Sequence, residues 1–250
     1  MSPQYQALYL SPHLDDAALS CGGHIHARAM AGDAILIVTL MAGDPPATTG
    51  TSAYVAALHE RWQLAANAAE QRRAEDVAAC RILGADHLHL SFPDCIYRGN
   101  PPFYQSDGDI FGNIHPREAG AMVTALAEAM AQLPTAAQII APLTVGNHVD
   151  HQLTRLAAER AFGNALSYYE EFPYVQKTGA VDAIIGNGAD WQSIITPLTE
   201  ANWAAKVESI AAFRSQLSTF FVDKDDIRRQ IGENGRLIGG ERLWTCKNSG

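Results

Sequence analysis

Cysteine is scarce in this sequence and shows no pairing pattern. The four cysteines are far apart and form no CxxC pair: Cys21, Cys80, Cys95 and Cys246. Disulfide-rich secreted domains and thiolate zinc sites both need closely spaced cysteines. We therefore expect reduced thiols in a cytoplasmic protein, and no zinc site made of cysteine.

Long apolar runs and an excess of basic charge are also missing. The longest apolar run, residues 34–43, is shorter than the ~20 residues that cross a bilayer, and Met1–Gln4 lacks the basic start of a signal peptide. The formal net charge is −9, which repels nucleic acid backbones and anionic lipid. We therefore expect neither nucleic acid nor a membrane as a partner, while a homo-oligomer is compatible with these properties.

What the sequence does contain is an alternation of strand and helix patterns. Short apolar strands are expected at residues 7–10, 34–40, 87–90, 138–141 and 166–170, and helices at 16–30, about 53–83, 116–133, 151–162 and 201–216. This alternation predicts an α/β fold with a mostly parallel sheet and helices on both faces. The length suits one domain over 1–250, whose pattern is less regular over 178–250.

Two polar loops of this pattern each follow a predicted strand. The first loop contains His13, Asp15 and Asp16, and the second contains His148, Asp150 and His151. In open parallel sheets, ligands bind beyond the carboxyl ends of the strands. We therefore expect both loops to open onto the same edge of the sheet and to bring their side chains together.

The residue types in these loops are those of a catalytic zinc site. One imidazole and one carboxylate from the first loop, with one imidazole from the second, give a His₂Asp set that leaves a position open for water. Bound zinc lowers the pKa of that water to about 7 and polarises a carbonyl. A further carboxylate can accept the water's proton, and a further histidine can protonate a leaving nitrogen. The pattern predicts a metal-dependent hydrolase.

Each of these residues also has a plainer explanation. Asp15 and Asp16 could cap the first helix, and His13 could be a hydrogen-bonded core histidine. Arg72 and Glu75 could contact substrate hydroxyls or form an exposed i,i+3 ion pair. The two clusters together, each after a predicted strand, favour a metal site over the plainer explanations.

The segments Ser11–Gly23 (SPHLDDAALSCGG) and Gly146–His151 (GNHVDH) resemble two motifs of one family. They are similar to the His-Pro-Asp-Asp-Glu…Gly-Gly signature and the His-x-Asp-His motif of the PIG-L/LmbE-like deacetylases. The resemblance covers about residues 5–175 and includes further landmarks at Arg72–Glu75, Leu83–Gly84 and Ser91–Asp94. Leu14 replaces the usual proline and Ala17 a frequent glutamate, which affects the substrate inference more than the chemistry.

This resemblance implies a Rossmann-like three-layer sandwich and Zn²⁺-dependent removal of N-acetyl groups, commonly from glucosamine derivatives. Carried over by motif position, the zinc ligands are His13, Asp16 and His151. Asp15 is then the general base, and His148 is the acid or oxyanion stabiliser, with Asp150 orienting it. The implied partner is a small molecule, an N-acetylated amino sugar conjugate. The 91–116 loop and Tyr168–Tyr174 are candidates for contacting its aglycone.

Three other functions are considered. A zinc amidase or esterase would act on a non-sugar substrate, and only an assay of the product distinguishes it from a deacetylase of amino sugars. A metal-binding protein without turnover would not need Asp15, which zinc binding does not require. A nucleotide-binding oxidoreductase is excluded because no GxGxxG follows the first strand and two adjacent aspartates would repel a pyrophosphate.

Overall fold

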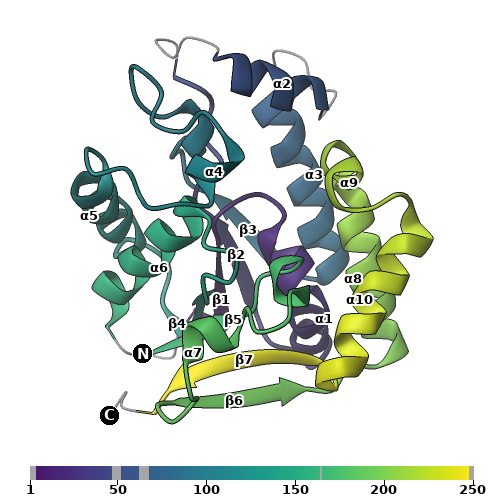
Figure 1. The fold of residues 1–250 in the computed structure, drawn as a ribbon. Helices are drawn as coiled ribbons and strands as arrows, with labels where there is room; N and C mark the ends of the chain where they lie inside the picture. The colour runs from purple at the N-terminus through teal and green to yellow at the C-terminus, as the bar shows by residue number, and fades with distance from the viewer. Residues whose placement is uncertain (1–3, 47–51, 62–67, 164, 248–250) are drawn as a thin grey trace.

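The computed structural model describes residues 4–46, 52–61, 68–163 and 165–247. They form a seven-stranded sheet with the order β3-β2-β1-β4-β5-β7-β6 (Figure 1). The strands are β1 (Tyr5–Ser11), β2 (Ile35–Thr39), β3 (Asp86–His89), β4 (Ala136–Pro142), β5 (Leu166–Tyr169), β6 (Trp191–Thr196) and β7 (Glu241–Cys246). The helices are α1 (Asp16–Met30), α2 (Ala53–Arg61), α3 (Ala68–Leu83), α4 (Asp107–Ile110), α5 (Ala119–Met130), α6 (Val149–Phe162), α7 (Asp182–Ile185), α8 (Glu200–Ala212), α9 (Arg214–Phe220) and α10 (Lys224–Ile238).

The strand β1 lies inside the sheet and is buried on both faces. It pairs in parallel with β2 on one side and β4 on the other. Leu8 and Leu10 belong to one hydrophobic core, and Ala7 and Tyr9 to the core on the opposite face. Strands buried on both faces read as continuous apolar runs, which is why the sequence pattern located β1 and β2 correctly.

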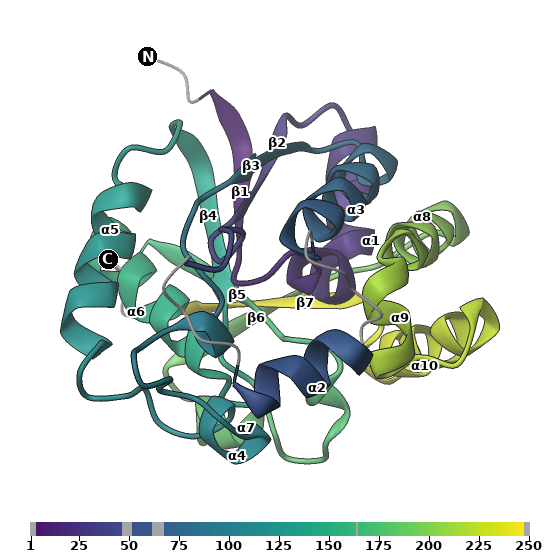
Figure 2. The ribbon, with the colours of Figure 1, turned by 90° about the horizontal axis from the view of Figure 1, so that it is seen from above.

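Helices cover both faces of the sheet, as the three-layer prediction requires. The pair α5 and α6 packs on one face, and α1, α3 and α8 pack against one another on the other (Figure 2). The predicted Rossmann-like α/β sandwich is therefore confirmed. No helix within the described residues is long and apolar enough to cross a membrane.

The C-terminal part departs from the sequence pattern. Residues 178–250, expected to be less regular, supply β6 and β7, which pair antiparallel with each other, and β7 also pairs antiparallel with β5. The predicted helix at 201–216 is two helices, α8 and α9, and the charged tail forms α10, whose Ile227 and Ile231 are buried. Because β6 and β7 extend the same sheet, they support the proposal of one domain over 1–250.

Two further predictions differ from the structure in the elements that the segments contain. The long helix expected up to Leu83 is described as α2 and α3, and residues 62–67 between them lie outside the described residues. The expected irregular loop at 91–116 contains a short 3₁₀ helix, Cys95–Tyr97, and the short helix α4. Both short elements bring side chains to the carboxyl edge of the sheet.

Candidate active site

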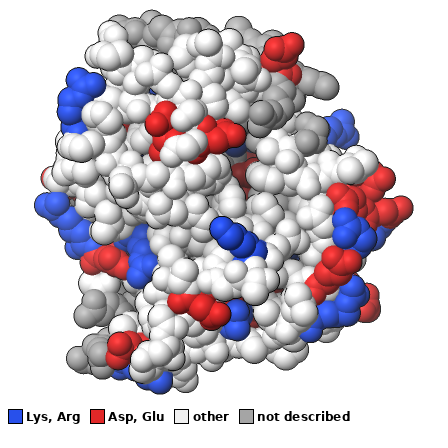
Figure 3. Space-filling model, in the orientation of Figure 1, with Lys and Arg blue, Asp and Glu red and all other residues white. Residues whose placement is uncertain are grey.

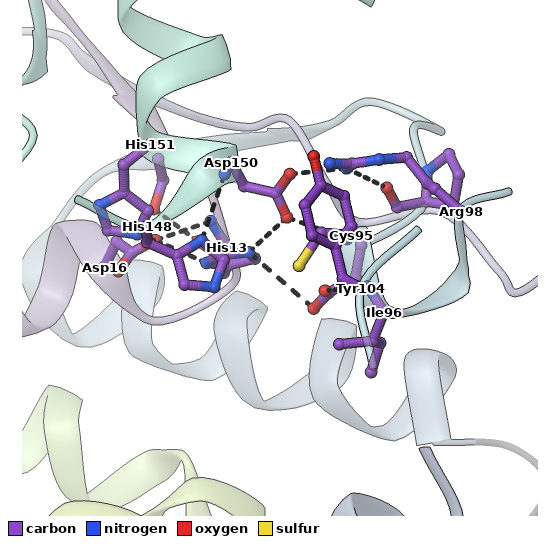
Figure 4. A network of polar contacts seen from close by, with 12 residues as sticks. His13, Asp16, Cys95, Ile96, Arg98, Tyr104, His148, Asp150 and His151 are labelled. Atoms are coloured by element: carbon purple, nitrogen blue, oxygen red, sulfur yellow. Dashed lines mark hydrogen bonds and ion pairs between the residues drawn. The ribbon is translucent and has the colours of Figure 1, made fainter. Parts of the chain in front are cut away.

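The two polar loops meet at the carboxyl ends of β1 and β4, as the sequence predicts. These strands are parallel neighbours, so the chain leaves both at the same edge of the sheet. His13 from the first loop lies with its Nε2 3.0 Å from Asp150 Oδ2, beside the second loop. Residues far apart in the sequence therefore share one buried cluster (Figure 4).

Asp16 lies between two imidazoles. Its Oδ2 is 3.2 Å from His13 Nδ1 and 3.3 Å from His151 Nε2. Burial alone would raise the pKa of Asp16, but the charge of His151 and hydrogen bonds with His13 and His151 hold it well below its usual range. An ionised carboxylate and two ring nitrogens thus face one another.

Each of these imidazoles has a second carboxylate on its other nitrogen. His13 Nε2 is 3.0 Å from Asp150 Oδ2, and His151 Nδ1 is 3.1 Å from Glu171 Oε1. Burial lowers the pKa of His151, yet Asp16 and Glu171 together raise it to about 9. A histidine that donates one N–H to a carboxylate presents its other nitrogen to a metal in a fixed orientation. The donor set therefore fits a metal ion.

Glu171 is a site residue that sequence reasoning missed. It is fully buried and accepts hydrogen bonds from the backbone N–H of Thr144 at 2.7 Å and of Val145 at 3.0 Å. It therefore ties the second polar loop to the end of β5 as well as orienting His151. Its position directly after a predicted strand is the signal that identifies it, whereas the sequence predicts only an aglycone contact for the segment Tyr168–Tyr174.

Asp150 contacts the rings of two histidines. The sequence predicts that Asp150 orients His148, and only the backbone N–H of Asp150 binds that ring. Its carboxylate contacts His13 and the backbone N–H of Cys95, the latter at 3.0 Å. The buried guanidinium of Arg98 lies 2.6 Å from Asp150 Oδ1 and also binds Glu118 (Figure 4). Because Arg98 neutralises Asp150, the carboxylate stays ionised and holds the ring of His13.

His148 begins α6 and serves as its N-cap. Its Nδ1 accepts a hydrogen bond from the backbone N–H of Asp150 at 3.2 Å. Burial, together with the charges of His13 and His151, lowers the pKa of His148 well below its usual value. A neutral ring with an occupied Nδ1 carries its proton on Nε2. This arrangement favours a hydrogen-bond donor to a developing oxyanion over a protonated acid.

Asp15 occupies the N-cap position of α1 without acting as a side-chain cap. Among the described residues its carboxylate makes no capping hydrogen bond, and it lines a cavity of about 200 Å³. Burial and the neighbouring charge of Asp16 raise the pKa of Asp15 to about 6. A general base works best when its pKa lies near the operating pH, so the environment of Asp15 suits proton transfer.

Aromatic side chains form much of the wall of this cavity. Phe172 and Tyr174 line it, whereas Tyr168 and Tyr169 of the same segment belong to the hydrophobic cores. Gly146 has a φ of +91°, and a Cβ there would lie 2.4 Å from the Tyr174 ring. Glycine at this position therefore lets the ring lie against the second polar loop.

The two residues proposed as substrate contacts have different locations. Arg72 lines the cavity, with its Nη1 4.0 Å from Asp94 Oδ2. Glu75 is not among the described residues that line it. Its carboxylate accepts hydrogen bonds from the Ser215 backbone N–H at 3.1 Å and from Ser215 Oγ at 2.6 Å. Glu75 thus holds the start of α9, and its contact with substrate hydroxyls stays a prediction.

Metal-dependent hydrolases orient their histidine ligands through buried carboxylates and keep a separate carboxylate for proton transfer. The fold and the site place the protein in that class. The chain belongs to the PIG-L family, described as GlcNAc-PI de-N-acetylase, whose model matches residues 8–162. The predictions of the family and of an N-deacetylase enzyme are confirmed.

Curated relatives carry the name 2′-N-acetylparomamine deacetylase. One from Streptomyces fradiae is 32% identical over 184 residues, which cover 71% of this chain and 60% of that protein. One from Niallia circulans is 25% identical over 261 residues, covering 95% of this chain and 89% of that protein. The match to the Streptomyces fradiae protein thus spans less than two thirds of its length.

Solved structures of deacetylases share the fold over nearly the whole chain. The zinc-inhibited form of teicoplanin deacetylase has a TM-score of 0.78 at 25% identity, covering 95% of this chain and 96% of that one. The A40926 pseudoaglycone deacetylase has a TM-score of 0.76 at 26% identity, covering 97% of both chains. The similarity therefore includes the C-terminal part that contains β6 and β7.

The Glu171→Gln variant is expected to bind metal about 10–100-fold more weakly, the usual cost of losing a carboxylate that orients a ligand. A glutamine amide cannot accept hydrogen bonds on both of its ends, so one contact to Thr144, Val145 or His151 is lost. Competition with a chelator of known affinity measures the effect.

The matched control is the neighbouring Glu170→Gln, because Glu170 binds Arg242 and Trp244 instead. The control is expected to keep wild-type metal affinity. Equal losses in the two variants would contradict an orienting role for Glu171.

Proposed function

We propose that the protein hydrolyses the N-acetyl group of an amino sugar carried by a small molecule, with zinc bound by His13, Asp16 and His151. The observation that carries this proposal is the buried cluster in which Asp16 faces two imidazoles that are each held by a further carboxylate. A set of imidazole nitrogens and a carboxylate oxygen suits zinc.

A second ligand set uses three histidines. One ring nitrogen each of His13, His148 and His151 lies within 4.8 Å of the other two. We prefer Asp16 to His148 because Nδ1 of His148 already accepts the hydrogen bond that caps α6. Asp16 Oδ2, in contrast, lies within 3.3 Å of both other ligand atoms.

The chain's own residues then have separate tasks in amide hydrolysis. Bound zinc would lower the pKa of water and polarise the acetyl carbonyl. Asp15 takes the proton from the attacking water. His148 donates a hydrogen bond from its Nε2–H to the carbonyl oxygen as negative charge develops there. Asp15 then passes the proton that it took from the water to the amide nitrogen, and the C–N bond breaks. Asp150 and Glu171 keep the ligand rings in place throughout.

The cavity supports an amino sugar as the substrate. Tyr54 and Phe111 line it together with Tyr174, and flat aromatic faces pack well against the apolar face of a sugar ring. The relatives named above are called deacetylases of N-acetylparomamine, of teicoplanin and of the A40926 pseudoaglycone. A glycosylated small molecule of antibiotic type is therefore the proposed substrate.

The proposal includes a cytoplasmic location, where cysteines stay reduced. No disulfide joins the four cysteines in the part of the chain that the structure describes, and three of them are buried. Lys and Arg side chains are scattered among acidic ones on the face drawn in Figure 3, which gives no support to a nucleic-acid partner.

The zinc-loaded enzyme is expected to release amine and acetate in equal amounts from at least one N-acetylglucosamine derivative. Free N-acetylglucosamine should be a poorer substrate, because binding energy from the remote part of the molecule is lost. A panel of N-acetyl amino sugars with varied aglycones, assayed for both products, measures this. Cleavage of other amides but of no amino sugar would contradict the substrate half of the proposal.

A further inference from the structure

A second, much smaller cavity lies beside Asp15, between α1, α8 and α9. Its volume is about 10 Å³, room for a single water-sized group. Apart from Asp15 and Gln216, its described lining is apolar and consists of Leu19, Ile210, Phe213, Leu217, Phe220 and Phe221. We call this space the side cavity.

The side cavity adjoins the main cavity at the proposed base. Asp15, Leu19, Gln216 and Phe220 line both spaces. A water that gives its proton to Asp15 attacks the carbonyl carbon from a position next to this shared wall. The acyl group that reacts beside Asp15 is therefore the part of the substrate nearest to the side cavity.

The two cavities suit the two halves of an N-acyl amino sugar. The main cavity is about 200 Å³ and presents Arg72 and Asp107 as well as aromatic rings, so it offers partners for hydroxyl groups. The side cavity offers mainly hydrocarbon and is far too small for a sugar. Burying a hydroxyl there without a hydrogen bond would be costly, whereas a methyl group gains from it.

We infer that the side cavity receives the methyl group of the N-acetyl substituent and limits the enzyme to short acyl chains, with Leu217 setting its depth. This inference rests on the proposed function and deepens it. The reaction is unchanged: the water oxygen bonds to the carbonyl carbon, the C–N bond breaks, and the nitrogen takes up the proton that Asp15 received from the water. The side cavity determines only the length of the carboxylic acid that is released.

Leu217 is the most informative position to change. It lies on α9, is only partly buried against the neighbouring hydrophobic cluster, and lines the side cavity without lining the main one. A shorter side chain at this position enlarges the side cavity and leaves the main cavity unchanged. A larger side chain fills the side cavity.

The experiment compares N-formyl, N-acetyl and N-propionyl forms of one amino sugar conjugate. Wild-type enzyme is expected to have a kcat/KM for acetyl that exceeds the value for propionyl by about 10-fold or more, since one methylene in a tight pocket gives about 10–200-fold. Leu217→Ala should lower this ratio about tenfold. Leu217→Phe should lower kcat/KM for the N-acetyl substrate relative to the N-formyl substrate. Thermal unfolding of both variants tests whether they are folded.

The control variant is Ile110→Ala, because Ile110 lines the main cavity but is not among the described residues of the side cavity. Its acetyl-to-propionyl ratio should stay at the wild-type value, whatever happens to its overall rate. Unchanged ratios in folded, active Leu217→Ala and Leu217→Phe would overturn the acyl assignment alone. A wild-type enzyme that releases acetate from no amino sugar would overturn the proposed function and this inference with it.

Discussion

The His13→Ala variant is expected to bind no zinc at the proposed site and to lose turnover by about three orders of magnitude or more. Without the His13 ring, Asp16 and His151 are the only proposed ligands left. Polarising a carbonyl by a metal is worth several kcal/mol, and each ~1.4 kcal/mol is about tenfold in rate. Elemental analysis and turnover, measured on one preparation, report both effects.

The fold of this variant should survive. Asp150 keeps the guanidinium of Arg98 and the backbone N–H of Cys95 when the ring of His13 is removed. His151→Ala tests the same ligand set less cleanly, because it leaves the fully buried Glu171 without its imidazole. Chelation of the wild-type enzyme should likewise abolish activity without unfolding the chain.

The control for His13 is His26→Ala. His26 lies on α1 and hydrogen-bonds Asn202 instead of the site. It should keep its zinc and its turnover. Full zinc occupancy in His13→Ala would remove His13 from the ligand set.

The Asp15→Asn variant is expected to keep zinc and to lose turnover by about 10²–10⁴-fold, the usual contribution of a general base. Asparagine has nearly the size of aspartate but cannot accept the proton from the attacking water. Asp15 lines the cavity, while the side chain that faces both imidazoles is that of Asp16. Steady-state kinetics together with zinc analysis separate the two roles.

The comparison variant is Asp16→Asn, which should lose zinc because an amide is a much weaker ligand than a carboxylate. The two changes are chemically identical and one residue apart, so a difference between them reflects position alone. If Asp15→Asn lost zinc as readily as Asp16→Asn, the roles of the two aspartates would have to be exchanged or merged.

The sequence by itself determined the architecture and the motif residues. Strands such as β1 and β2, buried on both faces, appear as uninterrupted apolar runs, so local patterning was enough to find them. The parallel pairing of β1 with β4 then brought His13 and His148 to one edge of the sheet by topology. The sequence pattern did not predict the antiparallel strands β6 and β7, because their burial depends on neighbours that are distant in the chain.

Only the tertiary structure decided which partner each side chain of the site has. Glu171, Arg98 and the side cavity at Leu217 lie outside the two motifs, and sequence position alone does not show which side chains they contact. The carboxylate of Asp150 contacts His13 and Arg98, while its backbone N–H binds the ring of His148. The carboxylate of Glu75 binds Ser215. Local sequence specifies periodicity and chain direction, whereas a contact across a few ångströms depends on how separate elements pack.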